Sequence, residues 1–207
     1  MLTCLLNEAI CAPVSCNRVD YNLVELTFRR IVMSKKVAVI AVNPVNGYGL
    51  FHYLESFYEN KIAYRVYAID ETVDIKTNSG IALKADDVIA NLKGKSADYD
   101  ALVFACGDAI PVFAQHAGET RYQDMFAVIN EFAAAGKLLV GHCGGGLIFD
   151  IAGITSGRKI ATHPYVQANV KNGIATGKTS EVDGNFYTAQ DENNIGEIIS
   201  ALIEALK

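Results

Sequence analysis

The sequence has no apolar run that reaches the roughly 18 residues needed to cross a membrane. It also has little positive charge: the net charge is −5, and the largest basic clusters are Arg29-Arg30 and Lys35-Lys36. A chain with this charge balance is a poor candidate for binding nucleic acid or an acidic membrane surface. No G-x-G-x-x-G motif follows the first predicted strand, and no Walker A motif is present, so nucleotide binding is not indicated.

The five cysteines lack the spacing of a disulfide framework. They are Cys4, Cys11, Cys16, Cys106 and Cys143. The N-terminal stretch has no clean apolar signal segment with a cleavage site, and it carries acidic residues that a transit peptide would avoid. We therefore expect reduced thiols in the cytoplasm. The first three cysteines lack a fourth ligand at suitable spacing, so we expect no metal and no cofactor.

The chain divides near residue 33. Residues 1–33 are predicted to be an N-terminal extension outside the core, and residues 34–207 a single domain of ordinary size. Met33 is followed by Ser34-Lys35-Lys36 and then at once by a strand, as at a natural protein start. A helix around residues 21–31 is the alternative.

Apolar strands alternate with amphipathic helices from Val37 onward. We expect strands at residues 37–42, 63–69, 101–105, 138–140 and 159–162, helices at 47–60, 86–92, 121–135 and 194–206, and hairpins at 72–84 and across Asp183-Gly184. This order predicts an α/β fold with a mostly parallel sheet and helices on both faces. The loops at 43–49, 106–111 and 143–146 should meet at the carboxyl ends of the strands, where such folds bind ligands.

One of these loops has the pattern of a nucleophile elbow. Residues 141–145 read Gly-His-Cys-Gly-Gly and lie between the strand at 138–140 and a possible helix from Leu147. Glycines allow a sharp turn that holds one side chain at the end of the strand, and a helix N-terminus favours thiolate over thiol. Cys143 is therefore a candidate nucleophile. The alternative is a buried, inert cysteine in a glycine-rich junction.

Several motifs together resemble the ThiJ/PfpI superfamily, which includes the parkinsonism-associated deglycase and the PfpI-type intracellular proteases. They are the elbow, Gly153-Ile154, residues 157–164 (Gly-Arg-Lys-Ile-Ala-Thr-His-Pro), residues 99–107 and residues 182–188. The resemblance covers roughly residues 35–207. It implies the flavodoxin-like three-layer sandwich of the class I glutamine-amidotransferase-like fold, and a homodimer.

The resemblance also implies roles for individual residues. Cys143 matches the family nucleophile and His163 the histidine close to it, while Gly107 and Gly144 match the backbone donors of an oxyanion pocket. Such groups suit thiolate attack, proton transfer and oxyanion stabilisation. The alternative for His163 is a capping or packing histidine before Pro164.

The sequence departs from the family in three places. The deglycase-like members carry an acidic residue after the first strand, whereas this chain has Asn46 or Gly47 there, so activity on 2-oxoaldehydes should be weak. Asn46 is a candidate for orienting a substrate carbonyl or a water. PfpI-type proteases have histidine directly after the cysteine, whereas this chain has Gly144, and His142 should point away. Glutaminase subunits carry His-x-Glu, which is absent after His163, so an amidotransferase is not expected.

The sequence is compatible with three functions. The first is a cysteine-dependent hydrolase- or lyase-like enzyme on small carbonyl or amide substrates. The second is a redox-responsive stress protein in which Cys143 is oxidised, and the third is a binding module without chemistry. Cys106 stands where the family has glycine, and it is either a small apolar filler or a partner that resolves oxidised Cys143 as a disulfide.

Overall fold

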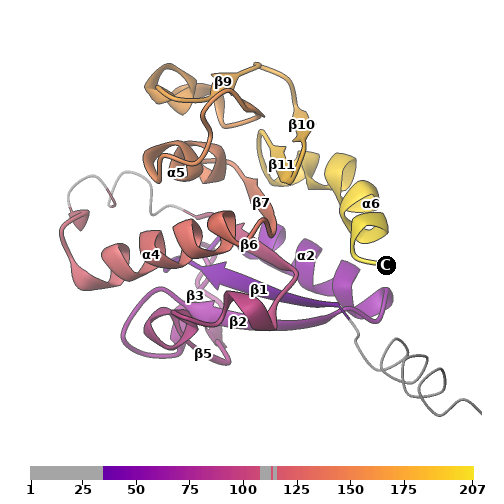
Figure 1. Ribbon diagram of the computed structural model, residues 1–207. Helices are drawn as coiled ribbons and strands as arrows, with labels where there is room; N and C mark the ends of the chain where they lie inside the picture. Colours follow the sequence, from indigo (N-terminus) through magenta and orange to yellow (C-terminus); the bar gives the residue numbers. More distant parts are fainter. Residues whose placement is uncertain (1–34, 108–112, 114–115) are drawn as a thin grey trace, which may run out of the picture. The chain divides into compact units, whose positions relative to one another are not determined.

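The structure is a computed structural model that describes residues 35–107, 113 and 116–207 (Figure 1). The predicted N-terminal extension at residues 1–33, its alternative helix and most of the loop after residue 107 lie outside the described residues.

A seven-stranded sheet forms the centre of the domain. Its order is β10 (Ser180–Asp183), β11 (Phe186–Ala189), β7 (Leu138–His142), β6 (Ala101–Ala105), β1 (Lys36–Ala41), β2 (Ala63–Ala68) and β5 (Asp87–Val88). Every neighbouring pair is parallel except the hairpin of β10 and β11. Two small sheets accompany it, the predicted hairpin of β3 (Asp74–Lys76) and β4 (Ala82–Lys84), and the pair β8 (Lys159–Ile160) and β9 (Ile174–Ala175).

Helices cover both faces of the central sheet. On one face α2 (Gly47–Glu59) packs against α6 (Ile195–Ala205), and on the other α4 (Thr120–Ala134) and α5 (Gly145–Ile151) pack against β6 and β7 (Figure 1). Short 3₁₀ helices connect the larger elements, at η1 (Ile89–Leu92), η2 (Ser96–Asp98), η3 (Pro164–Asn169) and η4 (Glu192–Asn194). The predicted flavodoxin-like three-layer sandwich is confirmed. None of the helices in the described part of the chain is both long and apolar enough to cross a membrane.

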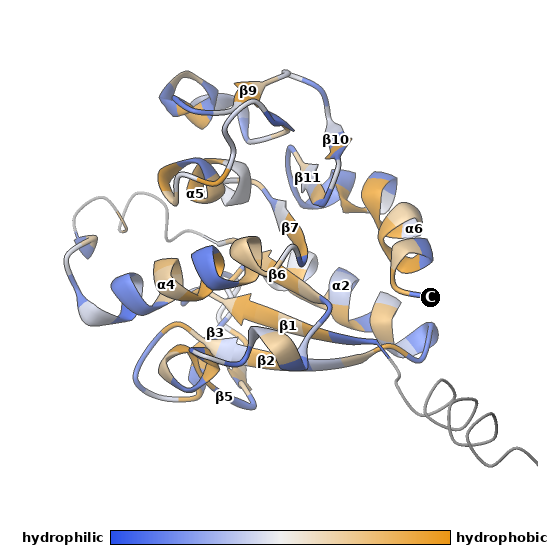
Figure 2. Ribbon diagram, viewed as in Figure 1, coloured by the Kyte–Doolittle hydropathy of each residue, from blue (hydrophilic) through white to orange (hydrophobic). Residues whose placement is uncertain are grey.

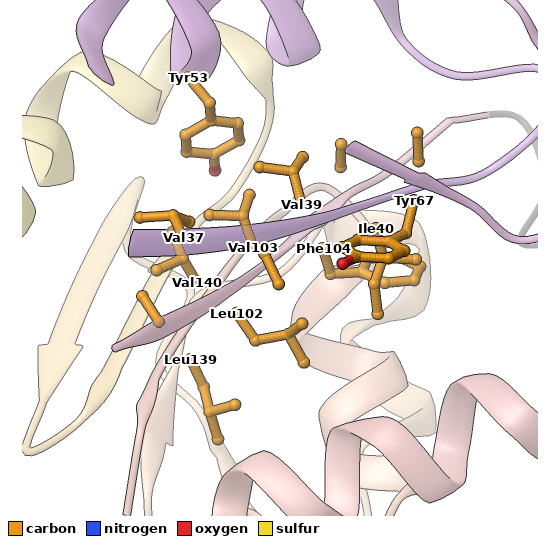
Figure 3. Close-up of a cluster of buried hydrophobic side chains, with 14 of the residues drawn as sticks. Val37, Val39, Ile40, Tyr53, Tyr67, Leu102, Val103, Phe104, Leu139 and Val140 are labelled. Atoms are coloured by element: carbon orange, nitrogen blue, oxygen red, sulfur yellow. The ribbon is translucent and has the colours of Figure 1, made fainter. Parts of the chain in front are cut away.

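The core is built on the two central strands. Residues 37–41 of β1 are completely buried, and all of β6 is at most 1% exposed. Both stretches consist of hydrophobic residues (Figure 2). Val37 and Val39 lie on the same side of the sheet as Tyr53 of α2, whereas Leu102 and Leu139 lie on the opposite side (Figure 3). Burying each such aliphatic side chain contributes about 1.5–3 kcal/mol, which holds the strand ends rigidly in place.

Two predicted elements differ from the observed ones. The segment 86–92 was expected to be a short helix, but Asp87 and Val88 pair with β2 as the edge strand, and only Ile89–Leu92 is helical. The Asp86 carboxylate accepts a hydrogen bond from the Val66 N–H at 2.7 Å, which brings this segment to the sheet. The strand expected at 159–162 ends at Ile160, because the Ala161 N–H donates to the Thr188 side chain instead of a strand neighbour.

Candidate active site

Cys106 and Cys143 follow directly after two neighbouring strands, β6 and β7, at the same edge of the sheet. The register of β6 and β7 pairs Phe104 with Gly141, and Cys106 and Cys143 each lie two residues further along. Cys106 is 1% exposed, Cys143 is half-buried, and both are free thiols. The expected meeting of these two loops at the carboxyl edge of the sheet is therefore observed.

The backbone at Cys143 is turned sharply and held on both sides. Cys143 has a φ of +55°, a conformation that residues other than glycine rarely adopt. Its N–H donates to the Ala189 carbonyl at 3.1 Å, and its carbonyl accepts from the His163 N–H at 2.9 Å and the Thr162 hydroxyl at 2.8 Å. The strand–turn–helix geometry of a nucleophile elbow is thus present around this residue.

The glycine at 146 is required for α5 to start so close to the turn. A Cβ at this position would lie 2.7 Å from the Ala161 carbonyl oxygen, closer than real contacts allow. The helix therefore approaches the backbone of the following segment without a side chain between them, and the same segment anchors the Cys143 carbonyl.

The two thiols differ in their tendency to ionise. A hydrogen bond from Cys106 lowers the pKa of Cys143, and the Gly144 N–H lowers it further, although partial burial opposes both. The same hydrogen bond, together with complete burial, raises the pKa of Cys106. Cys143 is accordingly the more acidic of the two thiols, and Cys106, whose thiol donates to the Gly107 carbonyl at 3.6 Å, is the less acidic one.

The predicted oxyanion donors lie beside these sulfurs. The Gly144 N–H lowers the pKa of both thiols, and the Gly107 N–H lowers the pKa of Cys106. A Cβ at Gly107 would lie 2.1 Å from the Pro44 carbonyl oxygen, so only glycine allows the loop after β1 to approach this closely. The role of both glycines in holding an oxyanion stays a prediction.

Asn46 caps helix α2. Its side-chain oxygen accepts a hydrogen bond from the Gly49 N–H at 2.8 Å, and its own N–H donates to the Cys106 carbonyl at 2.9 Å. The first bond caps the helix, and the second ties the start of α2 to the loop after β6. A role of Asn46 in orienting a substrate carbonyl or a water stays a prediction.

The first turn of α2 has no acidic residue, and two glycines there have no room for one. A Cβ at Gly47 would lie 2.8 Å from the Thr77 methyl group, and one at Gly49 would lie 2.5 Å from the His142 ring. Packing therefore disfavours any side chain, acidic ones included, at positions 47 and 49.

The imidazole of His163 makes a local contact. Its Nδ1 accepts from the Tyr165 N–H at 3.4 Å, and its ring stacks on the Tyr165 ring with centroids 5.1 Å apart. Within the described residues no hydrogen bond joins this imidazole to the Cys143 thiol, although its backbone N–H bonds the Cys143 carbonyl. The geometry at present fits the alternative of a capping histidine, and the catalytic role stays a prediction.

His142 faces α2, as the strand alternation predicts. It is completely buried next to Tyr53, with ring centroids 5.6 Å apart. Among the described residues neither ring nitrogen has a hydrogen-bond partner, and burial lowers the pKa of His142 to about 4. The ring is therefore neutral at physiological pH.

Two acidic residues near the thiol were not singled out from the sequence. Asp191 and Glu192 follow β11, whose Ala189 pairs with His142, and their negative charges raise the pKa of Cys143. Their position directly after a strand was the available signal, because strand ends gather at this edge. Within the described residues no three histidine, cysteine or acidic side chains are grouped as metal ligands would be.

The DJ-1/PfpI family pattern matches residues 35–205. The chain belongs to the DJ-1/PfpI family. The predicted ThiJ/PfpI membership is thereby confirmed. Protein ppBat from Bacteroides thetaiotaomicron is 57% identical over 175 residues, which is 84% of this chain and 100% of that protein.

Solved structures of the DJ-1/PfpI family agree with the fold. The structure of a candidate protease I from Bacteroides thetaiotaomicron has a TM-score of 0.82 at 57% identity, and the match covers 84% of this chain and 99% of that one. An oxidised DJ-1 from Toxoplasma gondii has a TM-score of 0.72 at 18% identity, with 83% and 90% covered. At that identity the likeness shows the DJ-1/PfpI fold alone.

Proposed function

We propose that the protein is a cysteine-dependent enzyme of hydrolase or lyase type that acts on small carbonyl or amide compounds. One observation carries this proposal: Cys143 lies at a strand–helix turn, and its pKa is lowered in part by the neighbouring Gly144 N–H. A nucleophile and an oxyanion donor within one site are the minimum that acyl or carbonyl chemistry requires.

In the proposed reaction the Cys143 thiolate attacks the carbonyl carbon of the substrate. The negative charge that develops on the oxygen is stabilised by the Gly144 and Gly107 N–H groups. His163 supplies the proton for the leaving group after its ring turns away from the Tyr165 N–H, a weak contact of 3.4 Å. Apo geometry of this kind tightens only when substrate is bound.

Labelling followed by a substrate screen tests the proposal. A limiting dose of iodoacetamide should modify Cys143 first, as mapped by mass spectrometry, because thiolate reacts faster than thiol. Wild type and Cys143→Ala are then compared on small aldehydes, esters, amides and a peptide amide, the last because a relative is described as a candidate protease I. Turnover that Cys143→Ala retains would refute the proposal.

A second candidate function is a redox response at the same thiol. It is favoured by the position of Cys106 and Cys143 at the ends of paired strands, which places two oxidisable thiols together at a site whose neighbouring helix has no acidic residue in its first turn. Peroxide treatment that modifies Cys143, with no substrate turned over in the screen, would favour this candidate.

We also propose a cytoplasmic location and a homodimer. The first rests on the cysteine spacing and the second on family resemblance. Size-exclusion chromatography with light scattering tests the dimer directly, since a mass equal to one chain would contradict it.

A further inference from the structure

We propose that Cys143 and Cys106 form a two-cysteine site that reduces hydroperoxides and closes a reversible disulfide between the two residues. The inference rests on the thiolate of the proposed function, but it needs neither the carbonyl substrate nor His163. It adds an activity with its own substrate class, a hydroperoxide, and its own reductant class, a small dithiol.

The register of the sheet brings the two residues within reach of each other. Each lies two residues beyond the last paired residues, Phe104 and Gly141, and adjacent strands lie about 4.8 Å apart. A disulfide needs Cα atoms roughly 4.4–6.8 Å apart, so the strand spacing meets this requirement.

The two side chains also lie close enough to influence each other. Each thiol is the largest influence on the pKa of the other, as expected of neighbouring sulfurs. The Cys106 thiol donates to the Gly107 carbonyl at 3.6 Å, so it has to rotate away from this weak contact when it reacts. Disulfide formation then requires the two sulfurs to approach to about 2.05 Å.

The first chemical step takes place at Cys143. Its thiolate attacks one oxygen of a hydroperoxide, ROOH, so that an S–O bond forms and the O–O bond breaks. The sulfur is oxidised by two electrons to a sulfenic acid, and the departing RO⁻ takes a proton from water to leave as ROH. Cys143 is the half-buried member of the pair, which lets the oxidant reach it.

The second step takes place at Cys106. Its sulfur attacks the sulfenic sulfur, an S–S bond forms and the S–O bond breaks, and the Cys106 proton leaves with the hydroxide as water. Burial keeps that proton on Cys106 until this step. A small external dithiol then reduces the disulfide by two exchange steps and is itself oxidised to a cyclic disulfide.

The position of Cys106 also protects Cys143 from further oxidation. Cys106 is 1% exposed and follows the strand next to the one that leads to Cys143, so it is held beside the sulfur that is oxidised. An intramolecular thiol held in this way competes with a second peroxide molecule at a high effective concentration. The wild-type protein should therefore stop at the disulfide under mild oxidation.

Peptide mapping of the full chain tests this proposal. The reduced protein is treated with equimolar hydrogen peroxide, blocked with iodoacetamide and digested with trypsin without reductant. We expect the peptides 96–121 and 138–158, which carry Cys106 and Cys143, to be cross-linked, and dithiothreitol to separate them. Sulfinic acid at Cys143 with Cys106 still a free thiol would overturn the proposal.

The variant Cys106→Ala separates the outcomes. With several equivalents of peroxide it should lose the cross-link entirely and accumulate sulfinic acid at Cys143, whereas the wild type stops at the disulfide. A Cys106→Ala protein that resists sulfinic acid formation as well as the wild type overturns the proposal. If iodoacetamide labels Cys143 in the wild type but peroxide forms no cross-link, this inference fails and the proposed nucleophile stands. If neither reagent modifies Cys143, both fail.

Discussion

Asp150 should be one of the most stabilising polar residues of the domain. It lies at the end of α5, it is 1% exposed, and one carboxylate oxygen accepts from Thr155 and from the N–H groups of Asn172 and Gly173. The other oxygen accepts from the Lys171 N–H at 2.7 Å. The carboxylate thus joins the helix that follows the elbow to the far end of the segment that carries His163.

The substitution Asp150→Asn is the informative perturbation. Asparagine keeps one oxygen for three of the donors but places its NH₂ group opposite the Lys171 N–H. One hydrogen bond to a charged acceptor, worth about 1.5–3 kcal/mol, is lost, and a buried N–H is left unpaired at a cost of about 1–3 kcal/mol. We expect a loss of about 3 kcal/mol, which for a domain of this size lowers Tm by about 6–12 °C.

The effect should depend on pH in a defined direction. Burial alone would raise the pKa of Asp150, but the hydrogen bonds from Lys171, Thr155 and their neighbours outweigh it and lower the pKa. The stabilisation is therefore complete above the unfolded value of about 3.9 and is lost as the pH falls through the lower, folded value. The difference between wild type and Asp150→Asn should shrink below about pH 4.

Thermal unfolding followed by circular dichroism measures the effect, with urea titration as a second method. The control is Asp74→Asn, whose exposed carboxylate pairs with Lys84 at 3.5 Å and should contribute less than about 1 kcal/mol. A Tm for Asp150→Asn within a degree or two of the wild type would refute the reasoning.

Four further outcomes are expected. Glu192→Gln removes a charge that raises the pKa of Cys143, so the pH midpoint of iodoacetamide labelling should fall; a rise would contradict the assignment. The free energy of unfolding of the wild type should decrease as the pH falls from 6.5 to about 4, because His142 stays neutral in the folded protein but is protonated in the unfolded chain. Urea titrations of His142→Phe should show a smaller decrease over the same pH range. Deleting residues 1–32 should leave Tm within about a degree or two, because the strand pattern starts at Val37; a larger drop would show that the segment packs on the domain. Turnover of 2-oxoaldehydes should stay far below the roughly 10 per second typical of enzymes, and a coupled assay at that rate would contradict this.

Much of the sheet could be predicted because its signal is local. The strand at 101–105 is apolar at every position, and helix α2 begins and ends within one residue of its predicted range. Strand β5 could not be predicted in this way. Asp87 and Val88 are too short a pair to show a period, and they are a strand only because β2 lies beside them.

The site was predictable to a similar extent. The motif located Cys143, and the order of strands placed Cys106 near it. The packing of His142 against Gly49 was not predictable, because the two residues belong to different elements and the contact depends on how closely α2 approaches β7. The approach of Glu192 depends in the same way on β11 pairing with β7.

The left-handed backbone of Cys143 lowers the stability of the fold at the position where the proposed chemistry needs a cysteine. A residue other than glycine in this conformation costs of order 1–3 kcal/mol, and glycine would relieve it. A mutational screen that selects for stability alone would thus tend to replace Cys143 by glycine. Such a screen therefore needs a second readout that depends on the thiol. Cys143→Gly, which removes both the thiol and the strain, is therefore a useful second inactive reference beside Cys143→Ala, which removes the thiol and keeps the strain.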